Sequence, residues 1–395
     1  MHRKLRRIAV LNERVYDMVV PPEELLDYMS EAIAADLSFT FPDEASPERI
    51  RGFLAGAEPD GSICSRVVCL RLSRPKPYPW TVDTVSSTHR RLMEGVPGCE
   101  PGRVRNGPYM PAEGGPRVPE WLQPYAEVTL ADVVRTMNES AYHPVIALSL
   151  FWNTMELLQP FQGDNTMFNG ELLVMAFKSW NLRGMGRTSL AKHLVAARIP
   201  MECARREFLE SGNPNLMASV TIDCCISALE EAERTLAPMD ISSKVDGLTG
   251  TILRSARRQR SFTLSDIHGW VGDISDQTFR SRLSALIDAG VIRKVGNTRG
   301  ARYEYVDPFM RVRERNGGPP PSQGDDDLVM KRLRRRRLLD FFSGSGYASP
   351  MSNSPIIETS MASASSRACS PSIPFWTFQT SVAASPMTRP FGVRA

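Results

Sequence analysis

Much of the chain places apolar residues three and four positions apart, which is the spacing of one buried face of an α-helix. This spacing predicts helices over Pro21–Ala34, His143–Leu158 and Asn215–Leu236. The first has proline in its first turn followed by acidic residues, a common helix start. Prolines and glycines interrupt the pattern over Ser38–Pro79, where only the run Val67–Leu72 indicates a short strand. The expected fold class is therefore mainly α.

Residues 245–310 show shorter elements in a different order. Phe262 and Leu264 indicate a short strand, and Ser265 is expected to cap a helix that runs through Val271. After a turn at Gly272, Ser275 is expected to cap a second helix. Two strands, over 291–295 and 302–306, then predict a hairpin. The apolar stripe of the second helix consists of Phe279, Leu283, Leu286 and Ile287.

These patterns divide the chain into four regions. Residues 1–80 give no clear pattern beyond one helix, 81–240 form the main helical domain, and 245–310 form the second domain. Residues 311–395 are rich in Ser and Pro and include the basic run Lys331–Arg337. Because this last region lacks acidic residues near its end and has no periodicity, we predict that it is disordered.

Composition narrows the class of protein. The chain is 42% hydrophobic and 23% charged, as is usual for a globular protein. No apolar run approaches the ~18 residues of a membrane span, and no signal peptide is evident, so we expect a cytoplasmic protein without a membrane partner. The seven cysteines form no Cys-x-x-Cys pair and have no histidine at a zinc spacing. We expect reduced thiols and no metal site.

The central block His143–Leu173 carries the most informative motif, HPVIALSLFWNTMELLQPFQGDNTMFNGELL. It resembles the signature of the Fic (Fic/Doc, Fido-domain) family, HPFx[D/E]GNGRxxR, when Gln159-Pro160-Phe161 takes the place of His-Pro-Phe. Gly102-Arg103-Val104-Arg105 resembles the family's GxxR element, and residues 106–124 lie where the family has a flap that docks its target protein. The resemblance covers about 85–240. It implies a Fic-like helical domain followed by a winged helix-turn-helix domain.

In the Fic family the histidine is a general base, an acidic residue holds Mg²⁺, and a Gly-Asn-Gly cradle with two arginines binds the phosphates of ATP. Here the catalytic motif is degenerate. Loss of a positioned base alone usually reduces a rate ~10²–10⁴-fold. The conserved positions are occupied by Gln159, Gly163, Asp164, Asn165, Met167 and Gly170. Pro160, Phe161 and Asn165 survive, and helix ending, core packing and N-capping account for them.

Two functions follow from the resemblance. The first is a catalytically degenerate Fic-like protein that acts as a binding or regulatory module and needs no cofactor. The alternative is a protein adenylyltransferase with altered active-site residues, which would use ATP and Mg²⁺ to transfer AMP to Ser, Thr or Tyr hydroxyls. A decayed gene product without a settled function is a third possibility. The 106–124 flap could contact a protein partner, and no feature indicates an oligomeric state.

The second domain offers a candidate DNA-binding surface. Opposite its apolar stripe, the second helix carries side chains of the kinds that reach base edges and phosphates. Arg299 and Arg302 lie at the hairpin tip, where a wing contacts the DNA backbone or minor groove. Arginines 254, 257, 258 and 260 could add phosphate contacts. Domains of this kind also serve in dimerisation and partner docking. DNA binding and a protein-interaction role are therefore both possible functions of this surface. The helix residues are Gln277, Arg280, Ser281 and Ser284.

Overall fold

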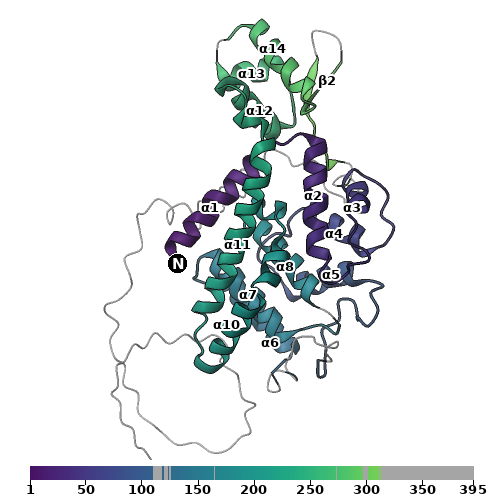
Figure 1. Cartoon of the computed structure of the whole chain (residues 1–395), viewed down its shortest axis with the longest axis vertical. Coiled ribbons are helices and arrows are strands. Elements are labelled where there is room, and N and C mark those ends of the chain that lie inside the picture. The colour runs from purple at the N-terminus through teal and green to yellow at the C-terminus, as the bar shows by residue number, and fades with distance from the viewer. Residues whose placement is uncertain are drawn as a thin grey trace, which may run out of the picture. The chain divides into compact units, whose positions relative to one another are not determined.

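The computed structural model describes residues 1–109, 118–119, 123, 126–163, 165–272, 274–296, 301–310 and 312, without the Arg258 side chain. It is mainly helical, as predicted (Figure 1). No helix within these ranges combines the length and apolar character that a membrane crossing requires. Up to residue 243 the elements are α1 (His2–Asp17), α2 (Pro22–Leu37), α3 (Pro47–Leu54), α4 (Ile63–Leu72), α5 (Val82–Met93), α6 (Ala126–Glu139), α7 (Pro144–Leu158), α8 (Thr166–Ser179), η2 (Arg183–Arg187), α9 (Leu190–Ala196), α10 (Arg198–Ser211), α11 (Asn215–Leu236), η3 (Ala237–Met239) and η4 (Ile241–Ser243).

The long helix α11 has the bounds that its periodicity predicted, and it packs against α1, α7, α9 and α10. Figure 1 shows α1 lying along it. Cys224 and Cys225 are buried in α11, and every cysteine in the described ranges is a free thiol, which confirms the prediction for those residues. Cys369 lies outside the described residues, as do most of the 106–124 flap and, apart from Val312, the tail over 311–395 with its basic run Lys331–Arg337. The predicted helices at 21–34 and 143–158 are also confirmed, as α2 and α7.

The strand predicted over Val67–Leu72 is wrong, because these residues end helix α4. Ser62 caps this helix by accepting a hydrogen bond from the Ser65 N–H. Residues on every side of α4 are buried, so its sequence shows a continuous apolar run instead of helical periodicity. A short run of that kind cannot be assigned to strand or helix from periodicity.

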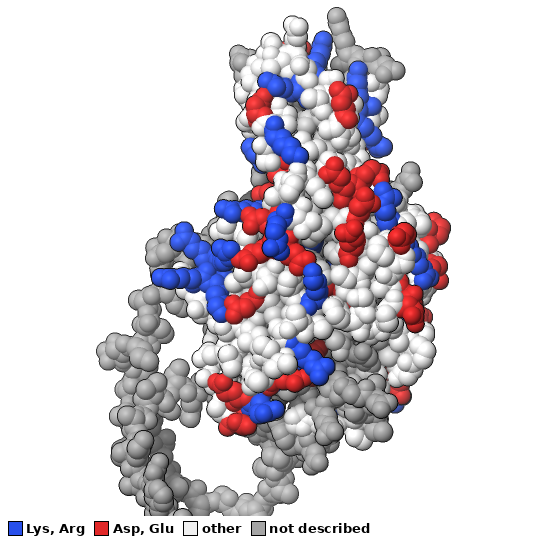
Figure 2. Space-filling model, viewed as in Figure 1, with Lys and Arg blue, Asp and Glu red and all other residues white. Residues whose placement is uncertain are grey.

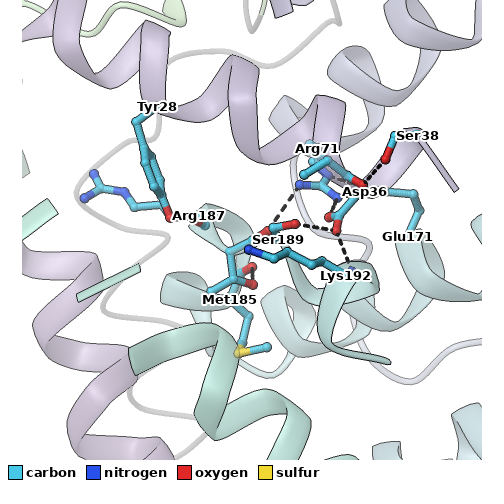
Figure 3. Close-up of polar contacts among 11 residues, drawn as sticks. Tyr28, Asp36, Ser38, Arg71, Glu171, Met185, Arg187, Ser189 and Lys192 are labelled. Atoms are coloured by element: carbon cyan, nitrogen blue, oxygen red, sulfur yellow. Dashed lines mark hydrogen bonds and ion pairs between the residues drawn. The ribbon is translucent and has the colours of Figure 1, made fainter. Parts of the chain in front are cut away.

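Arg71 of α4 forms a buried ion cluster with Asp36 of α2 and Glu171 of α8 (Figure 3). Their side chains are 2%, 3% and 4% exposed. The Arg71 guanidinium lies 2.5 Å from each carboxylate and also donates to the Thr188 carbonyl at 3.3 Å. This cluster joins α2, α4 and α8, and Asp36 also accepts a hydrogen bond from the Lys192 N–H of α9.

Residues 245–310 contain the predicted helices and hairpin, preceded by a further helix. The strands form an antiparallel sheet in the order β1-β3-β2, with Phe262 opposite Tyr303 and Lys294 opposite Tyr303. Phe279, with Val19 from the α1–α2 connection, is buried in the core beside this sheet. The elements are α12 (Gly247–Gln259), β1 (Ser261–Phe262), α13 (Leu264–Val271), α14 (Asp276–Asp288), β2 (Ile292–Val295) and β3 (Arg302–Tyr305).

One predicted cap in this part is wrong. The N-cap of α13 is Thr263, not Ser265, and a capping box joins Thr263 to Asp266. The helix therefore begins one residue before Ser265. The predicted cap at Ser275 is confirmed, since its hydroxyl accepts from the Thr278 N–H.

Candidate functional site

The motif residues lie in the turn between α7 and α8. Helix α7 ends at Leu158, and Gln159 adopts a left-handed backbone with φ 42°. Phe161 then enters the core, where it is fully buried and stacks on His89 with 3.8 Å between ring centroids. An isolated bridge pairs Phe161 with Val104, so the motif turn lies against the segment that follows α5. The structure thus brings the two sequence motifs, 102–105 and 159–170, into contact.

Arg105, the arginine of the GxxR element, holds this turn in place. Its side chain is 3% exposed and donates to the carbonyl oxygens of Leu158 at 2.9 Å and Gln159 at 2.8 Å. It also donates to the carbonyls of Gly107 at 2.7 Å and Gln123 at 2.5 Å. The first two bonds satisfy carbonyls at the C-terminus of a helix, which otherwise lack partners. Sequence reasoning identified this arginine by resemblance alone and missed its role as a clamp.

Gln159, at the position of the family's histidine, is fully buried. Its Nε2 donates to the Glu156 carbonyl at 2.8 Å, which directs the amide back over the end of α7. Its Oε1 is buried without a hydrogen-bond partner among the described residues. An amide in this setting neither takes up a proton nor reaches solvent.

Gly163, at the position of the Fic family's magnesium ligand, lies in close contact with Cys99. Its φ is +92°, and a Cβ built on it would lie 2.5 Å from the Cys99 Sγ. Its carbonyl accepts a hydrogen bond from the Tyr109 hydroxyl at 2.9 Å, which closes the turn further. The described residues contain no group of three His, Cys, Asp or Glu side chains placed to hold a metal. The residues present at this position do not fit Mg²⁺.

The two positions of the phosphate-binding arginines lie inside the core. Met167 is 4% exposed, and Gly170 is buried in α8, where an added Cβ would touch the Ala191 Cβ at 3.7 Å. Asp164 lies outside the described residues. Asn165 is the N-cap residue of α8, but its Nδ2 donates backward, to the carbonyls of Phe161 and Gly163, and not into the helix. The Asn165 side chain therefore contacts the motif turn and does not cap α8, so the side-chain capping predicted for it is wrong.

His89 lies beside the motif turn in the folded chain, although it is far from the turn in the sequence. Its Nδ1 accepts a hydrogen bond from the Gly102 N–H at 2.9 Å, and its side chain is 1% exposed. Burial lowers the pKa of His89 to about 4, so the ring is neutral near pH 7. With its Nδ1 lone pair engaged and its ring stacked on Phe161, His89 is a packing residue.

The second candidate surface is the outer face of α14. Gln277, Arg280, Ser281 and Ser284 are all exposed, opposite the buried Phe279. The Arg280 side chain is 67% exposed, with a carboxylate oxygen of Asp276 at 3.8 Å. Arg302, on β3, is exposed and donates to the Ser261 hydroxyl at 3.2 Å, whereas Arg299 lies outside the described residues.

The arginines at the C-terminal end of α12 and just after it make contacts within the protein. Arg257 lies over the Tyr16 ring at 4.5 Å from its centroid, and Arg260 pairs with Asp307 at 2.5 Å. Arg254 is exposed and donates to Thr251 at 3.3 Å. The predicted phosphate contacts of this cluster are therefore available to Arg254, while Arg257 and Arg260 are engaged.

Comparison with known proteins leaves the family open. No protein-family model and no curated protein matches the chain. The crystal structure of a Fic family protein from Desulfovibrio desulfuricans G20 is similar to it, with a TM-score of 0.44 and 16% sequence identity over 77% of this chain and 95% of that one. At that level the likeness says nothing about activity, which has to be argued from the residues.

Proposed function

We propose that the chain is a Fic-like protein that has lost catalysis and acts as a binding or regulatory module, with α14 as its DNA-contacting surface. The observation that carries the proposal is the packing at Gly163, where a Cβ would meet the Cys99 Sγ at 2.5 Å. A carboxylate that holds a metal ion needs a side chain at that point. The same turn buries an amide where the family has its base.

The proposal is also supported by the burial of three other motif positions. Gln159, Met167 and Gly170 are all buried, and each contacts the interior of the protein. A site retained for chemistry would keep polar groups that converge on an open space. The alternative, a protein adenylyltransferase with altered residues, would need a base, a cation ligand and a phosphate clamp from elsewhere in the chain. The histidine nearest the turn, His89, is buried and engaged.

The DNA part of the proposal rests on the exposed face of α14 and on charge. Residues 245–310 contain ten Lys and Arg against seven Asp and Glu, a net charge of +3, and Figure 2 shows both kinds of side chain exposed on this part of the chain. Arg280 and Arg302 project from separate elements of one compact unit, as expected of residues that contact bases and backbone on the same duplex. Asp276 beside Arg280 would repel phosphates, so it limits the affinity for the DNA backbone.

Label transfer from α-labelled ATP with Mg²⁺ onto protein tests the catalytic part. We expect no label on the natural chain. A Cys99→Ala, Gln159→His, Gly163→Asp variant is the informative partner, because the Cys99 change opens the space that the new carboxylate needs. Label on the natural chain would contradict the proposal and favour the adenylyltransferase.

A gel shift with labelled duplex DNA tests the second part. We expect binding that weakens with salt and falls ~5–100-fold on Arg280→Ala, the range for a base contact. Arg282→Ala is the matched control, since Arg282 lies on the same helix but pairs with Asp246 at 2.7 Å. Equal loss in both variants, or no shift at low salt, would leave protein docking as the better reading of this surface.

A further inference from the structure

A pocket of about 230 Å³ lies between α2, α9 and α11, away from the motif turn. Its floor is made of alanines from two helices, Ala32 and Ala35 of α2 with Ala228 and Ala232 of α11. Where two helices face each other with alanines, no large side chain fills the space between them. The pocket is large enough for roughly nine non-hydrogen atoms, given that a 150 Å³ cavity holds benzene.

The hydroxyl groups that line the pocket have already donated their hydrogens. Tyr28 donates to the Arg187 carbonyl at 2.7 Å, and Thr235 donates to the Glu231 carbonyl at 2.9 Å. Ser189 donates to the buried Asp36 at 2.7 Å, a contact visible in Figure 3. Burial raises the pKa of Tyr28, so its phenol keeps its hydrogen. These three oxygens can therefore offer a ligand only lone pairs.

The charged groups of the pocket also favour a ligand that donates hydrogen bonds. Lys192 Nζ is bound to Glu231 at 2.7 Å, and His193 Nε2 contacts the other Glu231 oxygen at 2.8 Å. Glu31 also lines the pocket, is exposed, and forms no ion pair that the described residues show. With Glu31 and Glu231 against Lys192, the lining carries one net negative charge.

We propose that this pocket binds a small primary amine, with its ammonium group near Glu31 and its carbon chain on the alanine floor. An ammonium has three N–H donors and no acceptor, which complements a wall of carboxylate and hydroxyl oxygens. A carboxylate or phosphate ligand would meet two glutamates, and the charge of Lys192, the lysine of the lining, is already balanced by Glu231. The apolar floor favours an amine that carries an alkyl or aryl group over a free ammonium ion.

Ligand-observed NMR and calorimetry with hexylamine test the proposal, with hexanol and hexanoate as the neutral and anionic probes of the same chain length. We expect hexylamine to bind the natural chain, hexanol to bind more weakly and hexanoate not to bind. Glu31→Gln should weaken the hexylamine affinity about fivefold, as for an exposed ion pair near its upper limit. Glu24→Gln is the matched control, since Glu24 is an exposed acid of α2 outside the pocket.

Ala35→Leu provides a second variant, because it fills the floor from a partly exposed position and leaves the charge unchanged. We expect it to abolish binding while the far-ultraviolet circular dichroism stays that of the natural chain. Equal binding of hexanoate, or hexylamine binding that survives both Glu31→Gln and Ala35→Leu, would overturn the proposal. If Ala35→Leu does not fold, Glu31→Gln and the three probes still decide it.

Discussion

The contact between Gly163 and Cys99 makes a quantitative prediction about whether the motif turn can accept a side chain. Gly163→Ala adds a Cβ at φ +92°, 2.5 Å from the Cys99 Sγ. The positive φ costs an L-residue about 1–2 kcal/mol, and the overpacking against the partly buried Cys99 costs a further ~1–3 kcal/mol if the sulfur cannot move away. We therefore expect Gly163→Ala to reduce the free energy of unfolding by roughly 2–5 kcal/mol.

A double-mutant cycle separates these two costs. Cys99→Ala removes the sulfur that the new methyl group meets but leaves the backbone strain unchanged. The double variant should therefore be less destabilised than the sum of the single variants, by ~1–3 kcal/mol of coupling. Urea unfolding followed by circular dichroism, with an unchanged slope against denaturant, measures each corner of the cycle.

Two outcomes would refute this reasoning. Additive effects would mean that Cys99 does not restrict the space at Gly163, and a neutral Gly163→Ala would mean that the turn adopts a different backbone. Either result would also remove the main support for a silent catalytic site. Coupling of the expected size would mean that an acidic residue at this position requires a second change before it can hold a cation.

Three further predictions concern the buried polar groups. Arg71→Met should cost about 3–5 kcal/mol of unfolding free energy in urea, because it leaves Asp36 and Glu171 as uncompensated buried carboxylates; replacing all three by apolar residues should recover most of the loss, and an equal loss would contradict this. His89 has a folded pKa of about 4 against an unfolded value near 6.5, so the unfolded state binds more protons between these values. Stability should be complete above pH ~6.5 and should fall by up to ~3 kcal/mol as pH drops to ~4, and His89→Gln should flatten this slope in urea melts at a series of pH values. Arg105→Ala removes four hydrogen bonds to carbonyl oxygens and should cost about 2–4 kcal/mol, with faster proteolysis near the motif turn as a second readout; an effect below ~1 kcal/mol would contradict its role as a clamp.

The elements that could be predicted from the sequence are those with one buried face. Helix α11 has its predicted bounds, 215–236, and helix α7 begins one residue after the predicted His143, because both helices show apolar periodicity. Helix α4 was assigned wrongly because nearly all its residues are buried, which removes the periodicity. The cap at Thr263 does have a signal in the sequence, because Asp266 stands three positions later and completes a capping box.

The site could be predicted only in part, because the motif reveals which side chains are absent and not what replaces them. The contacts that fill the turn come from Cys99 and Arg105, more than fifty residues before it, and from His89 in α5. None of the three has a sequence spacing that indicates a partner at 159–170, so their roles depend on tertiary packing. The same reasoning bears on function. A single substitution can silence a site and leave an open cavity that a reverse substitution restores. Under the proposed function, the base position is buried and the cation position lies against the Cys99 sulfur, so we expect a working site to require changes in the surrounding packing as well as in the motif.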